Sequence, residues 1–410
     1  QQMKFTRVFA FMALAGLAGS AYATNGYFSH GYGMKAKGMA GASTTNTEDA
    51  FFGANNPAAA AFVGNRIDLG VDLFSPIREA TMENWGGSGM NVSVESDDSY
   101  HLIPEFGYNR MVNNNLALGV TVYGNGGMNT HYSEVMPGTN LFGAPGALGI
   151  DLMQLVIAPT LAYKVAPNHS IGVSPLIGYQ LFKADGLGGP TSEHDDSFGY
   201  GVRVGYLGKI TPTITVGAAY SSEINFEEFD KYNWLFLENG DFDLPENYNL
   251  GVAWQATPAV KLALDYQRIN YGEVTAVGAP ASAGGFGYDN IDVWKLGVEY
   301  KYSQKLTLRA GYSHTDSPIV GASLAECMAG SVNCGETTLN ILAPAVIEDH
   351  VTLGFTYTLA SRNEVTMAYM HALKNDVSGQ GFAADGVTPT GTNTIQMYQN
   401  SLGIQYSWKM

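Results

Sequence analysis

Charged side chains stand between apolar residues in several stretches of this chain, where each charge requires a polar partner. Asp265, Lys295, Glu299 and Arg309 lie in three consecutive stretches of this kind and are predicted to form one network. An ammonium or guanidinium group in such a place can bind a ligand carboxylate through a charge-assisted hydrogen bond. The same charges can instead pair with one another and hold a neighbouring segment. Arg203 adds a further cation, so Arg203, Lys295 and Arg309 are the candidate carboxylate-binding residues.

The stretches that carry these charges alternate apolar and polar residues. Leu116, Leu118, Val120 and Val122, for example, alternate with small or polar residues. A period of two indicates β-strands with one apolar face. We assign that face to lipid, because an Arg or Lys facing the middle of a bilayer costs roughly 2–4 kcal/mol. The parity then places these residues on the inner face: Asp68, Asp72, Glu105, Arg203, Asp265, Lys295, Glu299, Arg309 and His350.

About fourteen such stretches occur, and short and long connections alternate between them. The stretches are centred near residues 70, 105, 119, 157, 176, 204, 220, 250, 265, 296, 310, 352, 368 and 402. The long connections are predicted at 76–99, 125–150, 184–196, 228–243, 273–289, 316–344 and 374–394. An even strand number with alternating turns and loops is typical of bacterial outer-membrane barrels. The sequence therefore predicts an all-β fold, a transmembrane antiparallel β-barrel of about 14 strands over residues 64–410.

One compact apolar run stands apart, at the start of the chain. Residues 1–23 have a basic beginning, a short apolar centre and an A-x-A ending, which is typical of a secretory signal peptide. A membrane anchor is the alternative, although the run is short for a bilayer. Removal of Lys4 and Arg7 takes two positive charges from the formal net charge and changes it from -16 to -18. This acidity argues against nucleic acid as a partner.

Residues 24–63 do not show the alternation. Residues 46–62 begin with polar and acidic residues, which predicts a short helix followed by a break at Asn56 and Pro57. A barrel of about fourteen strands has a lumen wide enough for a folded segment. We therefore predict an N-terminal hatch, a plug in the lumen. A disordered tail is the alternative, but it would carry fewer apolar residues than this segment does.

Three motifs in this segment resemble a known family. Residues 38–43 (Gly-Met-Ala-Gly-Ala-Ser), 48–50 (Glu-Asp-Ala) and Asn56-Pro57-Ala58 precede the first strand. This arrangement is similar to the FadL/TodX family of outer-membrane long-chain fatty acid and aromatic hydrocarbon transport proteins. The resemblance implies a fourteen-stranded barrel closed by a hatch that carries the Asn56-Pro57-Ala58 motif. It also implies that hydrophobic molecules pass from external loops into the barrel and then sideways into the membrane, beside an inward-kinked third strand.

The corresponding lateral opening would lie in residues 120–127. Asn125, Gly126 and Gly127 are predicted to end the third strand there.

One predicted external loop carries the consecutive residues Trp234, Leu235, Phe236 and Leu237. An exposed apolar patch on a rim that should be polar suggests capture of a hydrophobic ligand. Packing against neighbouring loops or against lipopolysaccharide is the alternative. Three residues of an earlier loop could extend the patch: Tyr132, Met136 and Phe142.

Cys327 and Cys334 lie in a polar stretch of a chain that is predicted to be exported, and their spacing predicts a disulfide within one loop. Too few further ligands stand near them for a metal site, and no metal or other cofactor is expected. The sequence contains no G-x-S-x-G, no H-E-x-x-H and no phosphate-binding loop with a following Lys. We therefore expect that the protein is not an enzyme, although a barrel hydrolase could assemble Ser, His and an acid from separate strands.

Together these features predict an outer-membrane, multi-pass channel for passive uptake of hydrophobic compounds, with long-chain fatty acids as the first choice of substrate. Uptake of monoaromatic hydrocarbons by the same route is the alternative. An outer-membrane barrel hydrolase and a water-filled porin are alternatives of other classes. The expected partners are hydrophobic small molecules, outer-membrane lipid and lipopolysaccharide, and the barrel-assembly machinery, with the channel itself a monomer.

Overall fold

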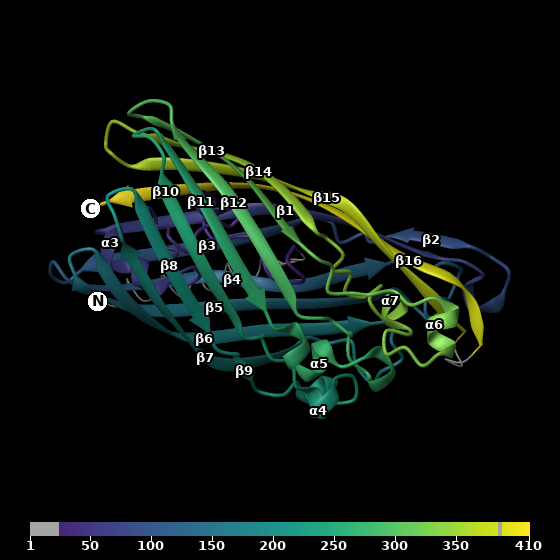
Figure 1. The fold of residues 1–410 in the computed structure, drawn as a ribbon. Helices are drawn as coiled ribbons and strands as arrows, with labels where there is room; N and C mark the ends of the chain where they lie inside the picture. The colour runs from purple at the N-terminus through teal and green to yellow at the C-terminus, as the bar shows by residue number, and fades with distance from the viewer. Residues whose placement is uncertain (1–23, 384–387) are drawn as a thin grey trace.

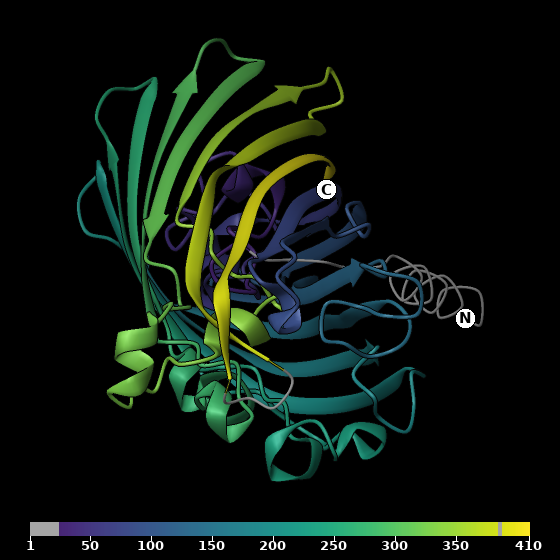
Figure 2. The same ribbon diagram turned by 90° about the vertical axis from the view of Figure 1, so that its right-hand side faces the viewer.

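The computed structural model describes residues 24–383 and 388–410, so the predicted signal peptide, residues 1–23, lies outside the described residues. The described chain forms one antiparallel sheet that closes on itself, because β16 pairs with β1. Of the sixteen strands in this sheet, β2 pairs only with β1 and β9 only with β7. The other fourteen form the barrel wall that Figures 1 and 2 show.

The wall strands are β1 (Arg66–Met82), β3 (His101–Met111), β4 (Leu116–Tyr132), β5 (Leu148–Ala166), β6 (His169–Asp185), β7 (Asp195–Lys209), β8 (Ile214–Ser221), β10 (Asn247–Gln255), β11 (Val260–Ile269), β12 (Ile291–Lys301), β13 (Leu306–Thr315), β14 (Asp349–Thr358), β15 (Glu364–Phe382) and β16 (Pro389–Lys409). The two additional strands are β2 (Val92–Glu95) and β9 (Asn225–Phe226). The helices are all short: α2 (Met34–Lys37), η1 (Pro57–Ala59), α3 (Ala60–Val63), η2 (Trp85–Gly87), η3 (Asp230–Tyr232), α4 (Leu237–Gly240), η4 (Tyr271–Glu273), α5 (Thr275–Gly278), η5 (Ala281–Ala283), α6 (Leu324–Met328) and α7 (Glu336–Leu339).

Each predicted strand centre falls within one wall strand, so the alternation located the strands correctly. In β1 the exposed fraction is 37% for Leu69 and 42% for Leu73, whereas Asp68 and Asp72 are buried. All nine charged residues assigned to the inner face are buried. Helices α4 to α7 gather at the end with the long connections (lower right in Figure 1), and the short turns lie at the other end.

Several strands extend beyond their predicted ends. β4 runs on to Tyr132, β15 runs to Phe382 and β16 begins at Pro389, so the connections predicted at 125–150 and 374–394 are too long. In these extensions, loops or other protein segments contact the wall. A strand face that contacts protein instead of lipid does not need to be apolar along its whole length. The alternation that signals a lipid-facing strand is therefore lost, although the strand continues.

Residues 24–63, called the N-terminal segment below, lie inside the barrel, where Figure 2 shows them surrounded by the wall. Nearly all of them are buried. The helix predicted ahead of Asn56 is wrong, because the helical residues follow it in η1 and α3. Asn56 caps η1 by accepting a hydrogen bond from the Ala58 amide at 3.1 Å, and Pro57 occupies the first helical position, which suits a residue with a fixed φ. Among the described residues, no helix is long and apolar enough to cross a bilayer.

Candidate functional site

The wall holds the N-terminal segment chiefly through acidic side chains that accept hydrogen bonds from its backbone. Asp265 accepts from the amides of Ser43 and Thr44, both at 2.8 Å, and from the Thr44 hydroxyl at 2.7 Å. Asp68 accepts from the Ala50 amide at 2.7 Å. A buried amide is costly without a partner. These inward carboxylates therefore fix the position of the segment.

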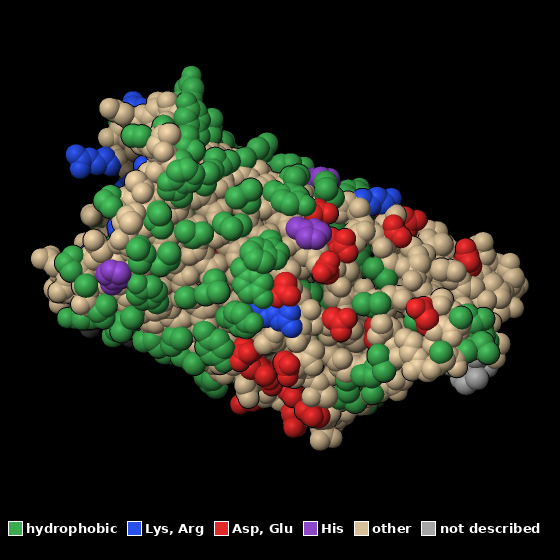
Figure 3. All heavy atoms as spheres, in the orientation of Figure 1, with side chains coloured by type: hydrophobic (Ala, Val, Ile, Leu, Met, Phe, Trp, Pro, Cys, Tyr) green, Lys and Arg blue, Asp and Glu red, His purple; other side chains and the backbone are tan. Residues whose placement is uncertain are grey.

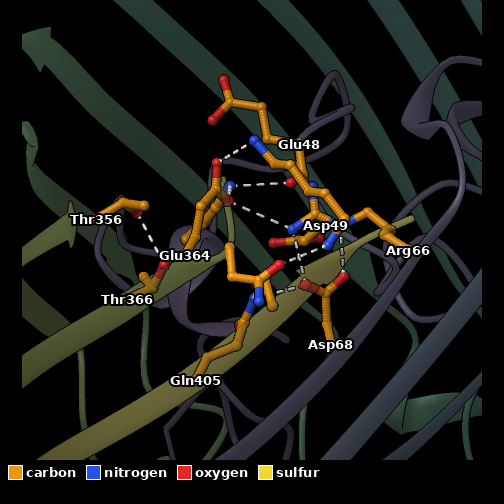
Figure 4. Close-up of polar contacts among 12 residues, drawn as sticks. Glu48, Asp49, Arg66, Asp68, Thr356, Glu364, Thr366 and Gln405 are labelled. Atoms are coloured by element: carbon orange, nitrogen blue, oxygen red, sulfur yellow. Dashed lines mark hydrogen bonds and ion pairs between the residues drawn. The ribbon is translucent and has the colours of Figure 1, made fainter. Parts of the chain in front are cut away.

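Ion pairs add a second set of contacts. Lys35 lies 2.8 Å from Glu364 and also donates to the Glu48 carbonyl at 2.9 Å. Arg66 forms a bidentate pair with Asp68, at 2.8 and 2.7 Å. Figure 4 shows Glu48 and Asp49 of the segment among the wall residues Arg66, Asp68 and Glu364. The buried charges of the segment and the wall thus compensate one another.

Close approach of the two backbones requires glycine in the wall. A Cβ atom on Gly311 would lie 2.4 Å from the Met39 carbonyl carbon, and one on Gly107 would lie 2.4 Å from the Ala50 carbonyl oxygen. Neither position leaves room for a side chain. Part of the high glycine content therefore serves the docking of the N-terminal segment.

The Asn56-Pro57-Ala58 motif joins the segment to two wall strands, β6 and β7. The Asn56 amide group donates to the Thr44 carbonyl at 2.8 Å and to the Tyr206 carbonyl on β7 at 2.9 Å. Ser170 on β6 donates to the Ala58 carbonyl at 2.8 Å. The motif is therefore a docking element of the segment.

The three candidate cations are in different environments. Arg309 pairs with Glu299 at 2.8 Å and with Glu48 of the N-terminal segment at 3.1 Å. Arg203 donates to the carbonyls of Gly53, at 2.9 Å, and Ala54. Both guanidinium groups thus hold the segment.

Lys295 differs, because it makes no hydrogen bond or ion pair within the described residues. It lines a cavity of about 20 Å³ together with Arg203, Tyr32 and Gln267. That volume holds roughly one water molecule. The predicted single network of four charges therefore divides into two parts. Glu299 and Arg309 form an ion pair, whereas Asp265 binds backbone amides and interacts with the opposite Lys295 only electrostatically, without a hydrogen bond or ion-pair contact.

The wall is interrupted between β3 and β4. Their ladder begins at the turn and stops at the pair Phe106 and Val122, although both strands continue. All residues from Tyr123 to Thr130 are buried, so this part of β4 has no lipid-exposed face. A bulge at Asn125, between Gly124 and Gly126, redirects the strand. The prediction that Asn125–Gly127 ends the strand is wrong, because the glycines permit a bulge within a continuing strand.

The first residues of the N-terminal segment lie against this part of β4. Phe28 forms an isolated bridge with Gly126, and the Ser29 amide donates to the Asn125 carbonyl at 3.1 Å. Tyr271, from the connection after β11, accepts from the amides of Tyr27 and Phe28 at 3.1 and 3.2 Å and donates to the Asn25 carbonyl at 2.5 Å. Sequence reasoning missed Tyr271, because a single Tyr in an irregular connection carries no periodic signal.

An aromatic cluster extends from these residues to the external loops. The Tyr27 ring lies 4.9 Å from the Tyr271 ring and 6.2 Å from the Phe242 ring, and Phe242 lies 5.1 Å from Phe236. Phe182 continues the cluster 4.7 Å from Phe236. Apolar side chains thus connect the external loops with the interrupted wall.

The predicted external patch is divided by this cluster. Trp234 is 38% exposed, whereas Phe236 is 6% exposed and belongs to the cluster. Leu235 and Leu237 are half-buried. Tyr132 is buried in β4 and donates to the Ile341 carbonyl at 2.9 Å. Residues 234–237 do not form one exposed patch, because the loops fold over the mouth of the barrel and bury part of this sequence.

A Ser–His contact occurs inside the barrel. Ser313 lies 3.1 Å from Nδ1 of His350, but both side chains are fully buried. Nε2 of His350 has no partner in the described residues, so no carboxylate orients the ring. The nucleophile, base and orienting acid of a serine hydrolase are therefore not assembled here.

Cys327 and Cys334 form a disulfide with their Cα atoms 5.2 Å apart. The bond closes the connection that contains α6, outside the barrel wall. Among residues 24–383 and 388–410, no three His, Cys, Asp or Glu side chains converge closely enough to hold a metal ion.

A closed fourteen-stranded barrel with an enclosed N-terminal segment defines a class of outer-membrane proteins. The sequence profile of the outer membrane protein transport protein family (OMPP1/FadL/TodX) matches residues 14–324. The chain therefore belongs to this family. No curated protein sequence matches it.

Solved structures share the fold. A FadL homologue from Pseudomonas aeruginosa has a TM-score of 0.71 at 15% identity, over 94% of this chain and 99% of its own. The P. putida toluene transporter TodX has a TM-score of 0.67 at 17% identity, over 93% and 99%. The Ralstonia pickettii toluene transporter TbuX has a TM-score of 0.63 at 16% identity, again over 93% and 99%. At these identities the likeness concerns the fold.

Proposed function

We propose that the protein is an outer-membrane channel for passive uptake of hydrophobic compounds, with long-chain fatty acids as its substrates. The observation that carries this proposal is the interruption between β3 and β4, which is filled by Tyr27 and Phe28 and not by a neighbouring strand. The aromatic cluster leads to it from the loops, so a hydrophobic molecule can remain in contact with apolar side chains along the way. The exit then faces the hydrocarbon core of the membrane.

In this proposal residues 24–63 act as a hatch, and only its first residues move. The remainder is bound to buried charges around the lumen, as Asp265 and Arg309 illustrate. Displacement of the whole segment would leave these charges without partners, which is far more costly than displacement of two aromatic residues. Substrate therefore leaves sideways past Tyr27 and Phe28, and the periplasmic end stays closed.

Lys295 favours a carboxylate-bearing substrate. It is the one candidate cation that makes no hydrogen bond or ion pair within the described residues, and its cavity adjoins Phe28 and Tyr32. The cavity of about 20 Å³ must enlarge to admit a carboxylate, and movement of Phe28 would enlarge it. Titles of the solved structures name TodX and TbuX as toluene transporters, so monoaromatic hydrocarbons are the competing substrate class.

A reversible crosslink tests the proposed exit. Ser29→Cys and Asn125→Cys place two thiols at a backbone contact of 3.1 Å between the hatch and β4, in a chain whose native cysteines are replaced by Ser. Oxidation should abolish uptake of labelled oleate, and reduction should restore it. A matched pair, Ala58→Cys with Ser170→Cys, joins the hatch to β6 instead. Uptake that continues in the first crosslinked protein, or stops equally in both, would rule out the lateral exit.

A further inference from the structure

The lipid-facing side of the wall carries a repeated contact near its external end. In five successive hairpins whose two strands are joined by a long connection, a Tyr of the first strand contacts a polar side chain in the second strand or directly before it. Three of these tyrosines donate to carboxylates: Tyr220 to Glu246, Tyr266 to Asp292 at 2.6 Å, and Tyr312 to Asp349. The other two contacts join Tyr179 with Asp196 and Tyr369 with Asn400 at 2.8 Å. We call these five contacts the tyrosine belt.

The five contacts share one register. Tyr266 pairs directly with Trp294, and the acceptor Asp292 stands two residues nearer the external end of β12. In the other four hairpins the polar residue likewise precedes, by two positions, the residue that pairs directly with the tyrosine. These directly paired residues are Phe198, Tyr248, Val351 and Leu402. Such a diagonal is within reach of a Tyr side chain. Figure 3 shows the wall apolar on one side of a line of charged side chains and largely polar on the other, as at a membrane interface.

The hairpin of β4 and β5 keeps the acid of the belt and lacks its tyrosine. Asp151 stands two residues from Met153, and the residue paired with Met153 is Gly127. Gly127 therefore occupies the place of the tyrosine, in the buried part of β4 beside the interrupted wall. Asn129 bonds Asp151 instead, and the amide oxygen of this 3% exposed Asn has no partner within the described residues.

A polar hollow of about 350 Å³ lies at this place. Three pairs of acidic and basic residues line it: Asp97 with His131 at 3.6 Å, Asp151 with His194 at 3.1 Å, and Asp185 with Lys183 at 2.8 Å. No three acids or imidazoles of the described chain converge on one metal ion. The hollow is also much larger than the roughly 30 Å³ of a water molecule. It is therefore suited to a polyatomic ligand.

We propose that this hollow binds the head group of one phospholipid that carries a primary ammonium and a phosphate. The tyrosine belt places the hollow at the level of lipid head groups, so a lipid is the molecule that reaches it. Asp98 brings the acids in its lining to four, against one Lys and two His, so an ammonium finds more acceptors than fixed cations. Lys183 is the fixed cation that can contact the phosphate.

This lipid would occupy a defined position beside the proposed exit. In the five hairpins of the belt a tyrosine side chain lies against the polar residue at this position. Here the missing side chain leaves that space for a head group, whose acyl chains then lie along the outside of β4 and β5. The lipid would thus line the membrane next to the interruption between β3 and β4.

Native mass spectrometry of the detergent-purified protein tests the proposal. Short-chain phosphatidylethanolamine and phosphatidylcholine with identical acyl chains differ in one decisive respect, because the quaternary ammonium of choline has no N–H to donate. We expect one tightly held phosphatidylethanolamine and at least tenfold weaker retention of phosphatidylcholine. Equal retention of the two lipids would overturn the proposal. It would also be overturned if the protein retained only lipopolysaccharide and lost it when divalent cations were chelated.

Two variants locate the lipid. Asp151→Asn should weaken phosphatidylethanolamine binding about tenfold, and the matched change Asp292→Asn, at the same belt position with its tyrosine present, should leave it unchanged. Lys183→Gln should weaken binding of phosphatidylethanolamine without altering the fold, which heat-modified electrophoretic mobility reports. If Asp151→Asn and Asp292→Asn lower binding equally, the lipid contacts the belt in general and the hollow is not its site.

Discussion

The two parts of the N-terminal segment are held in different ways. Its body, residues 33–63, is bound by buried carboxylates and ion pairs from the wall, with Asp265 alone accepting three hydrogen bonds. Its first residues, 25–29, are bound by a few backbone contacts, aromatic packing and one hydroxyl group, that of Tyr271. Buried charges are costly to separate, whereas aromatic side chains can exchange one apolar contact for another. The difference supports the proposal that the first residues open while the body stays in place.

The largest expected effect comes from Asp265→Ala, which removes the acceptor of two buried amides and a hydroxyl. The loss should destabilise the docked body by about 3 kcal/mol or more. Planar-bilayer recordings should show frequent large conductance steps, because the body no longer fills the lumen. Proteolysis within residues 33–63 should also become faster.

Asp292→Ala, which removes a carboxylate from the outer side of the wall, serves as the control. It should leave both measurements unchanged. A conductance for Asp265→Ala equal to that of the unmodified protein would show that the body does not depend on this anchor.

The next effect separates a structural cation from a substrate-binding one. Arg309→Met leaves buried Glu299 and half-buried Glu48 without their guanidinium partner, a loss of about 3 kcal/mol, and should lower uptake of oleate and toluene together. Lys295→Met breaks no ion pair. It should lower oleate uptake about tenfold through loss of a charge-assisted contact and leave toluene uptake unchanged.

Parallel loss of both substrates in Lys295→Met would assign this residue to the structure of the hatch. Loss of oleate uptake alone in Arg309→Met would reverse the two roles. Uptake by whole cells with equal amounts of outer-membrane protein is the measurement.

The alternation of the sequence was sufficient to place every wall strand and to assign Asp265, Lys295 and Arg309 to the lumen. That success has a physical cause, because lipid on one side imposes the pattern residue by residue. No such rule assigns partners inside the lumen. Glu48 pairs with Arg309 across more than two hundred residues of sequence, and Lys295 makes no hydrogen bond or ion pair within the described residues, for reasons of three-dimensional packing.

The region of the proposed exit was the hardest to predict. In β4 the residues Gly124, Gly126 and Gly127 break the alternation, and the same glycines would also suit a turn. Only the ladder, which stops at Val122 while the strand continues, distinguishes a bulge from a strand end. Likewise, residues 234–237 are all apolar and were therefore predicted to form an exposed patch. The burial of Phe236 depends on loops that fold over the barrel mouth, which the local sequence does not indicate.

Tyr271→Phe should affect the first residues of the segment and spare its body. The change removes one hydroxyl that accepts from the amides of Tyr27 and Phe28, and a loss of about 1–2 kcal/mol is expected. Amide hydrogen exchange at Tyr27 and Phe28 should become roughly tenfold faster, while exchange at Ser43 and Thr44 stays slow. Tyr288→Phe, which removes a hydroxyl bound to the Ala343 carbonyl, is the matched control. Equal acceleration at all four amides would mean that the segment opens as one unit.

The smallest effect concerns the loop that covers the first residues. Burial and neighbouring acids raise the pKa of Asp241 to about 7, and the pKa of Asp243 likewise to about 7. The two carboxyls face each other, and the further acids that face them are Glu238 and Glu228 for Asp241, and Glu223 for Asp243. Phe242, between the two aspartates, packs against Tyr27 at 6.2 Å.

The pKa of both carboxyls is higher in the closed loop than in the unfolded chain, so their protonation stabilises the closed loop. This stabilisation is complete below about pH 4. It is lost as the pH rises through about 7. Amide exchange at Phe242 and Tyr27 should therefore accelerate between about pH 6 and 8 by more than the intrinsic base-catalysed increase. Asp241→Asn, which has no charge to gain, should remove most of this excess. If the excess also appears at Ser43, the coupling reaches the body, and the distinction between a fixed body and a mobile end fails.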